Sequence, residues 1–447
     1  MSTASSLDPI SNPPPEAEAI YNFLTVKNYP DAQRLTDALL AREPENALGI
    51  YLRGVIYRSE GNLSGAIASF NKALKIKPDF KRACHDLADT LQQAKQLPLA
   101  FKTYEHLIKI EISEGVDTLP APVQLSKESE KTLNEWNDKG EVLYRQGRVE
   151  EAEKMFRKAL AISPDYPDVP INLSIALWRQ GKHEESEKIL IHCLKRMPNY
   201  APALNQLGNA YKEQRNLVKA IAAYRLSSAT KDYRQPLVNL GKTYFELSLF
   251  PDSIEAYERT LKIEPDFIEA LGELTYLRQM LCRWDRLEET RKPLIAAMQA
   301  GAQAGEPFIA TIYASAKLQL ENAVRWTRKL YPAAQGWKKD MKLPAITRND
   351  GKLRIGYVSS DLQYHATLAL VSELFEKHDR TKFEIYAYSH AIDDGGPERA
   401  RVREAVDGFR DILRMDDQAA CSLIAVLIYT LRWNSFNRVR PLHPIYI

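Results

Sequence analysis

Small, aromatic and proline residues return at a fixed spacing along most of the chain. Ala32, Ala66 and Ala100 stand 34 residues apart, and Pro164 and Pro198 are separated by the same interval. A proline closes the spacing in five places: Pro44, Pro78, Pro164, Pro198 and Pro265. Because proline cannot continue the hydrogen-bond ladder of an α-helix, each of these residues is expected to end a helix.

A period of this length, with small, aromatic, small and proline positions, is typical of the tetratricopeptide repeat (TPR), in which each unit is a pair of antiparallel helices. Glycine or alanine at the eighth position, such as Gly140, and alanine at the twentieth, such as Ala152, let two helix backbones approach closely. Bulky residues such as Phe156 fill the space between hairpins. We count seven units: 13–46, 47–80, 81–114, 133–166, 167–200, 201–233 and 234–267.

The register breaks once, after the third unit. Ser113–Thr132, with Pro120 and Pro122, is inserted there. We interpret the insert as a loop or an extended helix end, at which the solenoid bends or splits into two arrays. The expected divisions are a disordered N-terminus (1–12), repeats one to three (13–114), an insert (115–132), repeats four to seven (133–267), capping or docking helices (268–350), a Rossmann-like part (351–417) and a divergent tail (418–447).

The period fades after Pro265, and a different pattern begins at Lys352. Three helices are expected first, to cap the solenoid or to dock it to the C-terminal part: Ile268–Cys282, Trp284–Ala300 and Thr311–Trp326. The later pattern predicts a strand, a helix, a strand and a helix: Leu353–Val358, Thr367–Lys377, Phe383–Tyr388 and Glu398–Phe409. This order predicts a parallel, Rossmann-like sheet, so the expected fold is mainly α, a TPR solenoid followed by a partial α/β fragment.

Composition excludes several classes of protein. The net charge of +3 is too small to favour nucleic acid or an anionic membrane as a partner. Four isolated cysteines argue against a zinc site or a disulfide framework and fit a reducing cytoplasm. The first 18 residues lack the apolar core of a secretory signal, and the longest apolar run, Ala419–Leu431, is too short to span a bilayer.

The sixth position of the repeat carries the candidate peptide-binding residues. It holds an amide or a carboxylate in five units: Asp86, Asp138, Asn172, Gln206 and Asn239. An amide can pair with both the C=O and the N–H of an extended peptide, so a column of them would hold a peptide backbone without reading its sequence. Asn209, Lys212 and Lys242 are expected nearby. The alternative is that these polar residues are simply solvated on an exposed helix face.

His365 is the strongest single candidate for a catalytic or ligand-binding residue. It follows Ser359–Tyr364 at the carboxyl end of the first predicted strand. Ligands of open α/β sheets bind at that edge, and a histidine there can transfer a proton or hydrogen-bond a ligand. The competing interpretation is an incidental loop histidine.

Two stretches of this sequence resemble a known family. Leu353–His390 (LRIGYVSSDLQYHATLALVSELFEKHDRTKFEIYAYSH) is similar to the opening of the catalytic region of the O-linked N-acetylglucosamine transferases, a group that includes the SPINDLY proteins. Leu274–Glu289 (LTYLRQMLCRWDRLEE) resembles the helix that ends the family's TPR array. The resemblance implies a GT-B fold and transfer of N-acetylglucosamine from UDP-GlcNAc to Ser or Thr hydroxyls without a metal. It also implies that His365 matches the family's active-site histidine and that protein substrates lie along an asparagine ladder in the TPR groove.

This chain departs from the family's pattern at several positions. Only Asn172 and Asn239 are asparagines on the ladder, and Ala369 stands where animal members often have a second histidine. The resemblance fails from Cys421 onward, where a third strand would be expected. We therefore expect a chain truncated within the first lobe, with no cofactor, no UDP-GlcNAc binding and no transferase activity of its own. The alternative is a TPR interaction scaffold with a vestigial tail.

Overall fold

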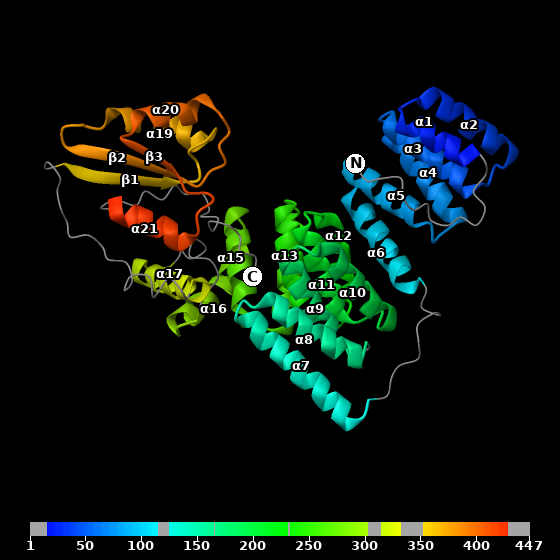
Figure 1. Ribbon diagram of the computed structural model, residues 1–447, viewed down its shortest axis with the longest axis horizontal. Helices are drawn as coiled ribbons and strands as arrows, with labels where there is room; N and C mark the ends of the chain where they lie inside the picture. The colour runs from blue at the N-terminus through cyan, green and yellow to red at the C-terminus, as the bar shows by residue number, and fades with distance from the viewer. Residues whose placement is uncertain are drawn as a thin grey trace. The chain divides into compact units, whose positions relative to one another are not determined.

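The computed structural model describes residues 16–114, 125–164, 166–230, 233–302, 314–331 and 352–427 (Figure 1). The chain divides into two compact units, residues 1–305 and 306–447. The N-terminus expected to be disordered, residues 115–124 of the expected insert and residues 428–447 of the expected tail lie outside the described residues. Within the described part, no helix is both long and apolar enough to cross a membrane.

The first unit is a succession of helix pairs, as the 34-residue period predicts. In order they are α1 (Glu16–Thr25), α2 (Tyr29–Arg42), α3 (Ala47–Ser59), α4 (Leu63–Ile76), α5 (Lys81–Gln93), α6 (Leu97–Ser113), α7 (Lys127–Arg145), α8 (Val149–Ile162), α9 (Asp168–Arg179), α10 (His183–Arg196), α11 (Ala201–Glu213), α12 (Leu217–Ser227), α13 (Gln235–Glu246), α14 (Phe250–Ile263), α15 (Ile268–Met280), the 3₁₀ turn Trp284–Arg286 and α16 (Leu287–Gln299). Asn28, Asn46 and Asn62 cap three of these helices by accepting a hydrogen bond from a backbone N–H that has no partner in its own helix. The solenoid predicted from the spacing is confirmed.

Glycine at the eighth position lies directly under the aromatic ring of its own repeat. A Cβ atom added to Gly140 would come within 2.5 Å of the Phe156 ring, and one added to Gly208 within 2.5 Å of the Tyr224 ring. Where serine replaces alanine at the twentieth position, its hydroxyl donates to the carbonyl of the eighth residue, as Ser253 does to Gly241 at 2.7 Å. The repeat pattern therefore records a close contact between the two helices of each pair.

The helix pairs continue beyond the last unit that the period predicts. α16 packs against α15, and α15 packs against α14. Cys282, in the turn after α15, has a φ of 54°, and the corresponding turns after α11 and α13 contain Arg215 (φ 63°) and Ser248 (φ 60°). The turn geometry is thus retained where the proline and aromatic positions have been lost.

The array is interrupted between α6 and α7, at the insert. α6 packs against α12 and α10, the second helices of later repeats. Arg225 Nε of α12 lies 2.5 Å from Glu105 Oε1 of α6, although the two residues are 120 positions apart in the sequence. Phe101 of α6 also meets Tyr244 of α13, with ring centroids 6.0 Å apart. Of the two alternatives left open by the sequence, a bend or a split, these contacts favour two arrays, α1–α6 and α7–α16, that pack side by side.

The second unit contains a three-stranded parallel sheet. Its elements are α17 (Ala316–Leu330), β1 (Leu353–Ser359), α19 (Ala366–Lys377), β2 (Phe383–Ser389), α20 (Pro397–Ala405), β3 (Gly408–Asp411) and α21 (Asp417–Leu427). The strand order is β1-β2-β3, and Leu353 of β1 pairs with Phe383 of β2. The predicted pairing of the first two strands is confirmed, and the fragment is Rossmann-like.

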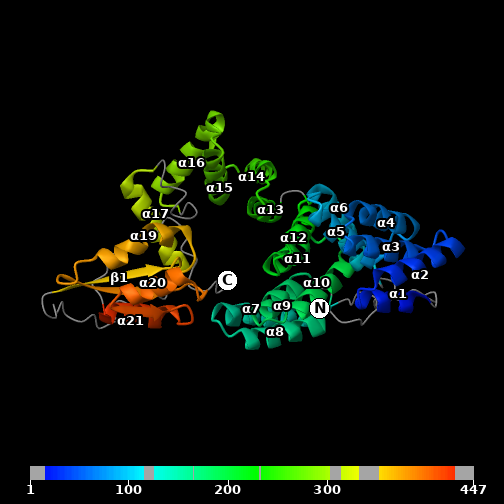
Figure 2. The ribbon, with the colours of Figure 1, turned by 90° about the horizontal axis from the view of Figure 1, so that it is seen from above.

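One feature of this unit corrects the prediction. The helix expected at Glu398–Phe409 ends at Ala405, and Gly408–Asp411 is a third strand parallel to β2. Both faces of the sheet are covered, since α19 and α20 lie on one side and α21 on the other (Figure 1; Figure 2 shows the same unit from above). Ile385 of β2 packs with the α19 and α20 side, whereas Tyr388 packs with Ala420 of α21.

Candidate functional site

His365 lies at the carboxyl end of β1, where it begins α19. Its Nδ1 atom accepts a hydrogen bond from the Thr367 N–H at 3.1 Å and so acts as the N-cap of the helix. An Nδ1 atom that accepts a hydrogen bond carries no proton, so the neutral ring holds its proton on Nε2. The side chain is one-third exposed. His365 therefore offers an Nε2–H donor at the edge where open α/β sheets bind ligands.

A buried carboxylate stands behind this histidine. Asp361 is 6% exposed, and its Oδ1 accepts a hydrogen bond from the Ser360 hydroxyl at 3.0 Å. Its Oδ2 lies 3.7 Å from His365 Nδ1 and takes no hydrogen bond within the described residues. The carboxylate thus faces the same ring nitrogen of His365 that caps α19.

A second histidine follows β2 at the same edge of the sheet. The His390 N–H donates to the Ser359 carbonyl at 3.2 Å, which ties the end of β2 to the end of β1. Burial lowers the pKa of His390 below its ordinary value of 6.5, while the Asp361 carboxylate acts in the opposite direction. Burial is the larger effect, so the ring is expected to be neutral at physiological pH. His390 was not predicted from the sequence as a site residue.

Arg399 of α20 joins the loops at this edge. It is 2% exposed, and its Nη1 atom donates to the Leu362 carbonyl at 2.7 Å and to the Ser389 hydroxyl at 2.8 Å. Its Nη2 atom donates to the Asp411 carboxylate at the end of β3. One guanidinium thus connects the loop after β1 with the last residues of β2 and β3. Sequence reasoning missed it because Arg401 and Arg403 on the same helix carry the same charge and face solvent.

The two loops are also tied by a carboxylate. Asp394 Oδ2 accepts a hydrogen bond from the Tyr364 N–H at 2.6 Å, and its Oδ1 accepts one from the Gly396 N–H at 3.0 Å. These backbone donors hold the pKa of Asp394 below its ordinary value. The edge is therefore a preorganised set of polar groups rather than a loose pair of loops.

The cavity beside this edge is small. It is lined by residues of β1, the following loop and α19, among them Ser359, Asp361 and Thr367, and its volume is about 10 Å³. That is room for a single water molecule, whereas pockets for drug-sized ligands and cofactors measure ~300–1,000 Å³. The described part of this unit thus offers anchoring groups for a ligand beside a cavity that holds no more than a water molecule.

In the first unit, the predicted amides form hydrogen bonds between neighbouring repeats. Asn172 Nδ2 of α9 donates to Asn137 Oδ1 of α7 at 3.0 Å and to Glu141 Oε1 at 3.3 Å. Asn239 Nδ2 of α13 donates to Asn205 Oδ1 of α11 at 2.9 Å and to Asn209 Oδ1 at 3.2 Å. In both cases, therefore, the asparagine Nδ2 group donates to the preceding repeat.

The remaining predicted groove residues are placed differently. Gln206 Oε1 accepts from Asn209 Nδ2 at 3.0 Å within α11. Asp138 is exposed, and the contact with Asn172 is made by Asn137, which is buried one position earlier. This fifth position was not considered from the sequence, although asparagine at both 137 and 205 was the available signal.

The charged residues expected near the groove are paired. Lys212 Nζ lies 2.8 Å from Glu246 Oε1, and Lys242 Nζ lies 2.5 Å from Glu269 Oε1. Each pair joins one repeat to the next. The lysines therefore add little net charge to this face of the array, and the amides remain its distinguishing groups.

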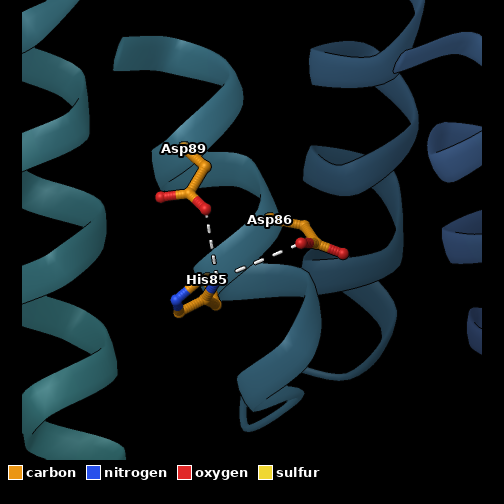
Figure 3. Close-up of side chains that lie close together, drawn as sticks. All are labelled: His85, Asp86 and Asp89. Carbon is orange, nitrogen blue, oxygen red and sulfur yellow. Dashed lines mark ion pairs between the residues drawn. The ribbon is translucent and has the colours of Figure 1, made fainter. Parts of the chain in front are cut away.

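Asp86 belongs to a compact cluster with His85 and Asp89 on α5 (Figure 3). His85 Nδ1 lies 3.4 Å from Asp89 Oδ2 and 4.0 Å from Asp86 Oδ1, close enough for three donors to surround a cation. Asp86 is already occupied, since its Oδ1 accepts from Arg58 Nη1 at 2.9 Å and its Oδ2 accepts from the Tyr51 hydroxyl at 2.7 Å. The positive charge of Arg58 opposes a metal ion here, so this cluster is a set of structural ion pairs.

Comparisons with known proteins agree with both halves of this description. A model for glycosyl transferase family 41 matches residues 335–426, and two tetratricopeptide repeat models match residues 19–79 and 143–192. The UDP-N-acetylglucosamine–peptide N-acetylglucosaminyltransferase of Caenorhabditis elegans is 35% identical over 65 residues, which are 14% of this chain and 6% of that protein. The SEC protein of Arabidopsis thaliana, whose name gives the same activity, is 33% identical over 73 residues, 16% of this chain and 8% of its own.

Solved structures give low overall similarity. A Thermobaculum terrenum O-GlcNAc transferase has a TM-score of 0.23 at 18% identity, with 67% of this chain and 45% of that chain covered. The MamA protein has a TM-score of 0.32 at 21% identity and covers 39% of this chain and 97% of its own. The segments matched in the C. elegans and A. thaliana transferases amount to under a tenth of the length of those two proteins. The chain is a tetratricopeptide-repeat protein that carries a glycosyl transferase family 41 region and is related to the O-GlcNAc transferases.

Proposed function

We propose that the helices carrying Asn172, Gln206 and Asn239 bind an extended segment of a partner protein, in the manner of a substrate-binding array of a family 41 glycosyltransferase. The observation that carries this proposal is the pair of amide contacts between neighbouring repeats, Asn172 with Asn137 and Asn239 with Asn205. Stacked repeats create extended concave surfaces that bind other chains. Because each amide on this surface is held in one orientation, only its free group can form a hydrogen bond with a ligand.

The atom of each amide that makes no contact between repeats indicates which groups of a ligand could bind there. Both Nδ2 groups donate to the preceding repeat, so each amide keeps its Oδ1 available as an acceptor. Within the described residues, Asn172 Oδ1 takes no hydrogen bond, and Asn239 Oδ1 receives only a 3.5 Å contact from Gln235 Nε2. These two oxygen acceptors can receive hydrogen bonds from the N–H groups of an extended peptide, which recur on one side at every second residue. The proposed ligand is therefore a peptide backbone, recognised without regard to its side chains.

We expect the triple variant Asn172→Ala, Gln206→Ala, Asn239→Ala to weaken peptide binding roughly tenfold or more, because each lost hydrogen bond is worth about 1 kcal/mol. Peptides selected from an array of extended 15-residue sequences (~15 residues span about 50 Å) would be labelled with a fluorophore and titrated into both proteins. The variant also loses contacts between repeats, so its stability should fall by about 1 kcal/mol for each asparagine removed.

A matched variant separates binding from stability. Asn137→Ala with Asn205→Ala removes the shorter of the two contacts that each groove asparagine makes with the preceding repeat, but leaves the groove amides in place. We expect it to lose stability and to retain affinity. Equal affinity of the triple variant and the parent chain would reject the groove assignment.

We expect the 447-residue chain by itself to bind no UDP. The cavity at the end of β1, which Ser359, Asp361 and Thr367 help to line, has a volume of about 10 Å³, far below what a nucleoside diphosphate needs. Isothermal calorimetry should give no saturable heat, and radiolabelled UDP-GlcNAc should transfer no label to a peptide that the array binds. The C. elegans relative serves as the positive control. A specific, saturable UDP heat that His365→Ala abolishes would contradict this expectation and establish a donor site at the sheet edge.

A further inference from the structure

The junction between the two TPR arrays contains a partly buried cluster of charges. α6 ends the first array and packs against α10 and α12 of the second. Near its last turn, Glu111 Oε1 lies 3.8 Å from Lys219 Nζ of α12, and Glu187 Oε1 of α10 lies 3.6 Å from the same nitrogen. Neither distance is that of a hydrogen bond. One ammonium is therefore shared by two carboxylates that belong to different arrays.

This cluster is partly shielded from water, with the side chains of Glu111 and Glu187 24% and 29% exposed. Lys219 is 11% exposed, and its Nζ atom lies 4.1 Å from the centroid of the Tyr211 ring. The Tyr211 hydroxyl donates to Glu187 Oε1 at 2.9 Å, so Glu187 has a hydrogen-bond partner in addition to the lysine. Glu111 Oε2 is buried and takes no hydrogen bond within the described residues. Glu111 is thus the least satisfied member of the cluster.

The charges around Glu111 come from four helices. Lys219 on α12 favours its ionised form, and Glu187 on α10 opposes it. Lys81 and His85 on α5 also favour the ionised form, and Tyr211 on α11 completes the surroundings. Burial is the largest effect and raises the pKa of Glu111 above its ordinary value of 4.5. Two of the groups that act on it, Glu187 and Lys219, lie across the junction.

We propose that Glu111, Glu187 and Lys219 form a pH-sensitive clasp, which holds α6 against α10 and α12 most tightly when Glu111 carries a proton. With Glu111 neutral, Lys219 and Glu187 remain as a simple ion pair. With Glu111 ionised, two partly buried carboxylates share one ammonium, and the buried Oε2 atom of Glu111 is left without a partner within the described residues. Deprotonation therefore costs the docked state more than it costs a state in which α6 is solvated.

The sign of the pH dependence follows from proton linkage. The docked state has the raised pKa and binds more protons, so docking is strongest at acidic pH. The extra stability is lost as the pH rises through the raised pKa of Glu111. One proton changes the docking equilibrium constant by at most about tenfold per pH unit. The nearby Glu105–Arg225 pair, at 2.5 Å, provides contact that does not depend on this proton.

Energy transfer between fluorophores on the two arrays measures docking in the full chain. Labels are placed at the exposed positions Lys72→Cys on α4 and Lys154→Cys on α8, after the exposed Cys282 and Cys421 are replaced by serine. Urea is added until docked and undocked molecules are both present. We expect the docked fraction to fall as pH rises from about 5 to about 8, the range above the ordinary glutamate pKa.

Two glutamine variants on the same helix decide whether Glu111 is responsible. Glu111→Gln should abolish the pH dependence and keep the docked fraction at its acidic value. Glu114→Gln, which removes an exposed carboxylate paired with Lys81 at 2.8 Å, should keep the parent's pH dependence. A parent chain whose docking ignores pH, or a Glu111→Gln variant that keeps the parent's slope, would overturn the proposal.

A third variant tests the shared lysine. Lys219→Met leaves two carboxylates without their common ammonium, so the docked fraction should be lower than the parent's at every pH above the acidic limit. Far-ultraviolet circular dichroism confirms that the helices of each array remain folded. A docked fraction equal to the parent's in a folded Lys219→Met protein would also overturn the proposal.

Discussion

Replacing Arg399 with methionine is expected to destabilise the α/β unit by about 3 kcal/mol. The substitution leaves the Leu362 carbonyl and the Ser389 hydroxyl without their buried donor, and it removes one of the two arginines that contact Asp411, the other being Arg403. Breaking a buried charge network from one side typically costs ~3–5 kcal/mol. Asp411 is about half exposed and water can solvate it, so the lower end of that range applies. A sheet of three short strands has little stability to spare.

Hydrogen exchange of peptides that cover β1, β2 and β3 measures this effect in the intact chain. Arg399→Met should increase exchange in all three strands, because the arginine connects the loop after β1 with the last residues of β2 and β3. Arg401→Met is the matched control, since Arg401 lies on the same helix and is half exposed, with Glu376 as its partner at 2.6 Å. It should change stability by under ~1 kcal/mol. Unchanged protection in Arg399→Met would contradict the role of the guanidinium as the link between loops.

Replacing Gly140 with leucine is expected to destabilise the first TPR pair of the second array by about 1–3 kcal/mol. The Cβ alone would stand 2.5 Å from the Phe156 ring, so either the ring or the helix must move. Gly140→Ala gives a sharper contrast. At an ordinary position inside a helix, replacing glycine with alanine stabilises by ~1 kcal/mol, whereas here it should destabilise.

A double substitution shows whether the ring causes the loss. Phe156→Leu alone should cost stability because a buried aromatic ring is lost. In that background, Gly140→Ala should be neutral or stabilising, since the ring that it would strike is gone. Urea unfolding followed by circular dichroism gives the four free energies of the cycle. The same cost of Gly140→Ala in both backgrounds would show that the contact does not determine the need for glycine.

The repeat and its internal packing could be predicted from the pattern of residue types. The pairing of Gly140 with Phe156 depends on residues sixteen positions apart in one hairpin, and such contacts recur at each repeat and leave a periodic signal. The first two strands were also predicted, since Leu353–Val358 and Phe383–Tyr388 are apolar runs of ordinary strand length. These features are local, and for that reason the order of residue types reveals them.

Other features depend on how the helices and strands pack. Gly408–Asp411 has four residues, and it becomes a strand because Tyr386–Ser389 offers backbone partners beside it. The choice of Asn137 over Asp138 depends on which side of α7 faces α9, and both residues are polar neighbours separated by only about 100° around the helix axis. In the sequence, Arg399 cannot be distinguished from the exposed arginines near it, because its burial depends on how the edge of the sheet packs.

The junction of the two arrays illustrates the same division most clearly. The sequence showed where the register breaks, because an insert interrupts a period. It could not show that α6 then packs against α12, since Glu105 and Arg225 are 120 residues apart and carry charges common on any helix surface. Burial of Glu111 and the sharing of Lys219 arise from that docking. Periodicity reports contacts within and between successive repeats, whereas contacts between distant repeats depend on how the chain turns in space.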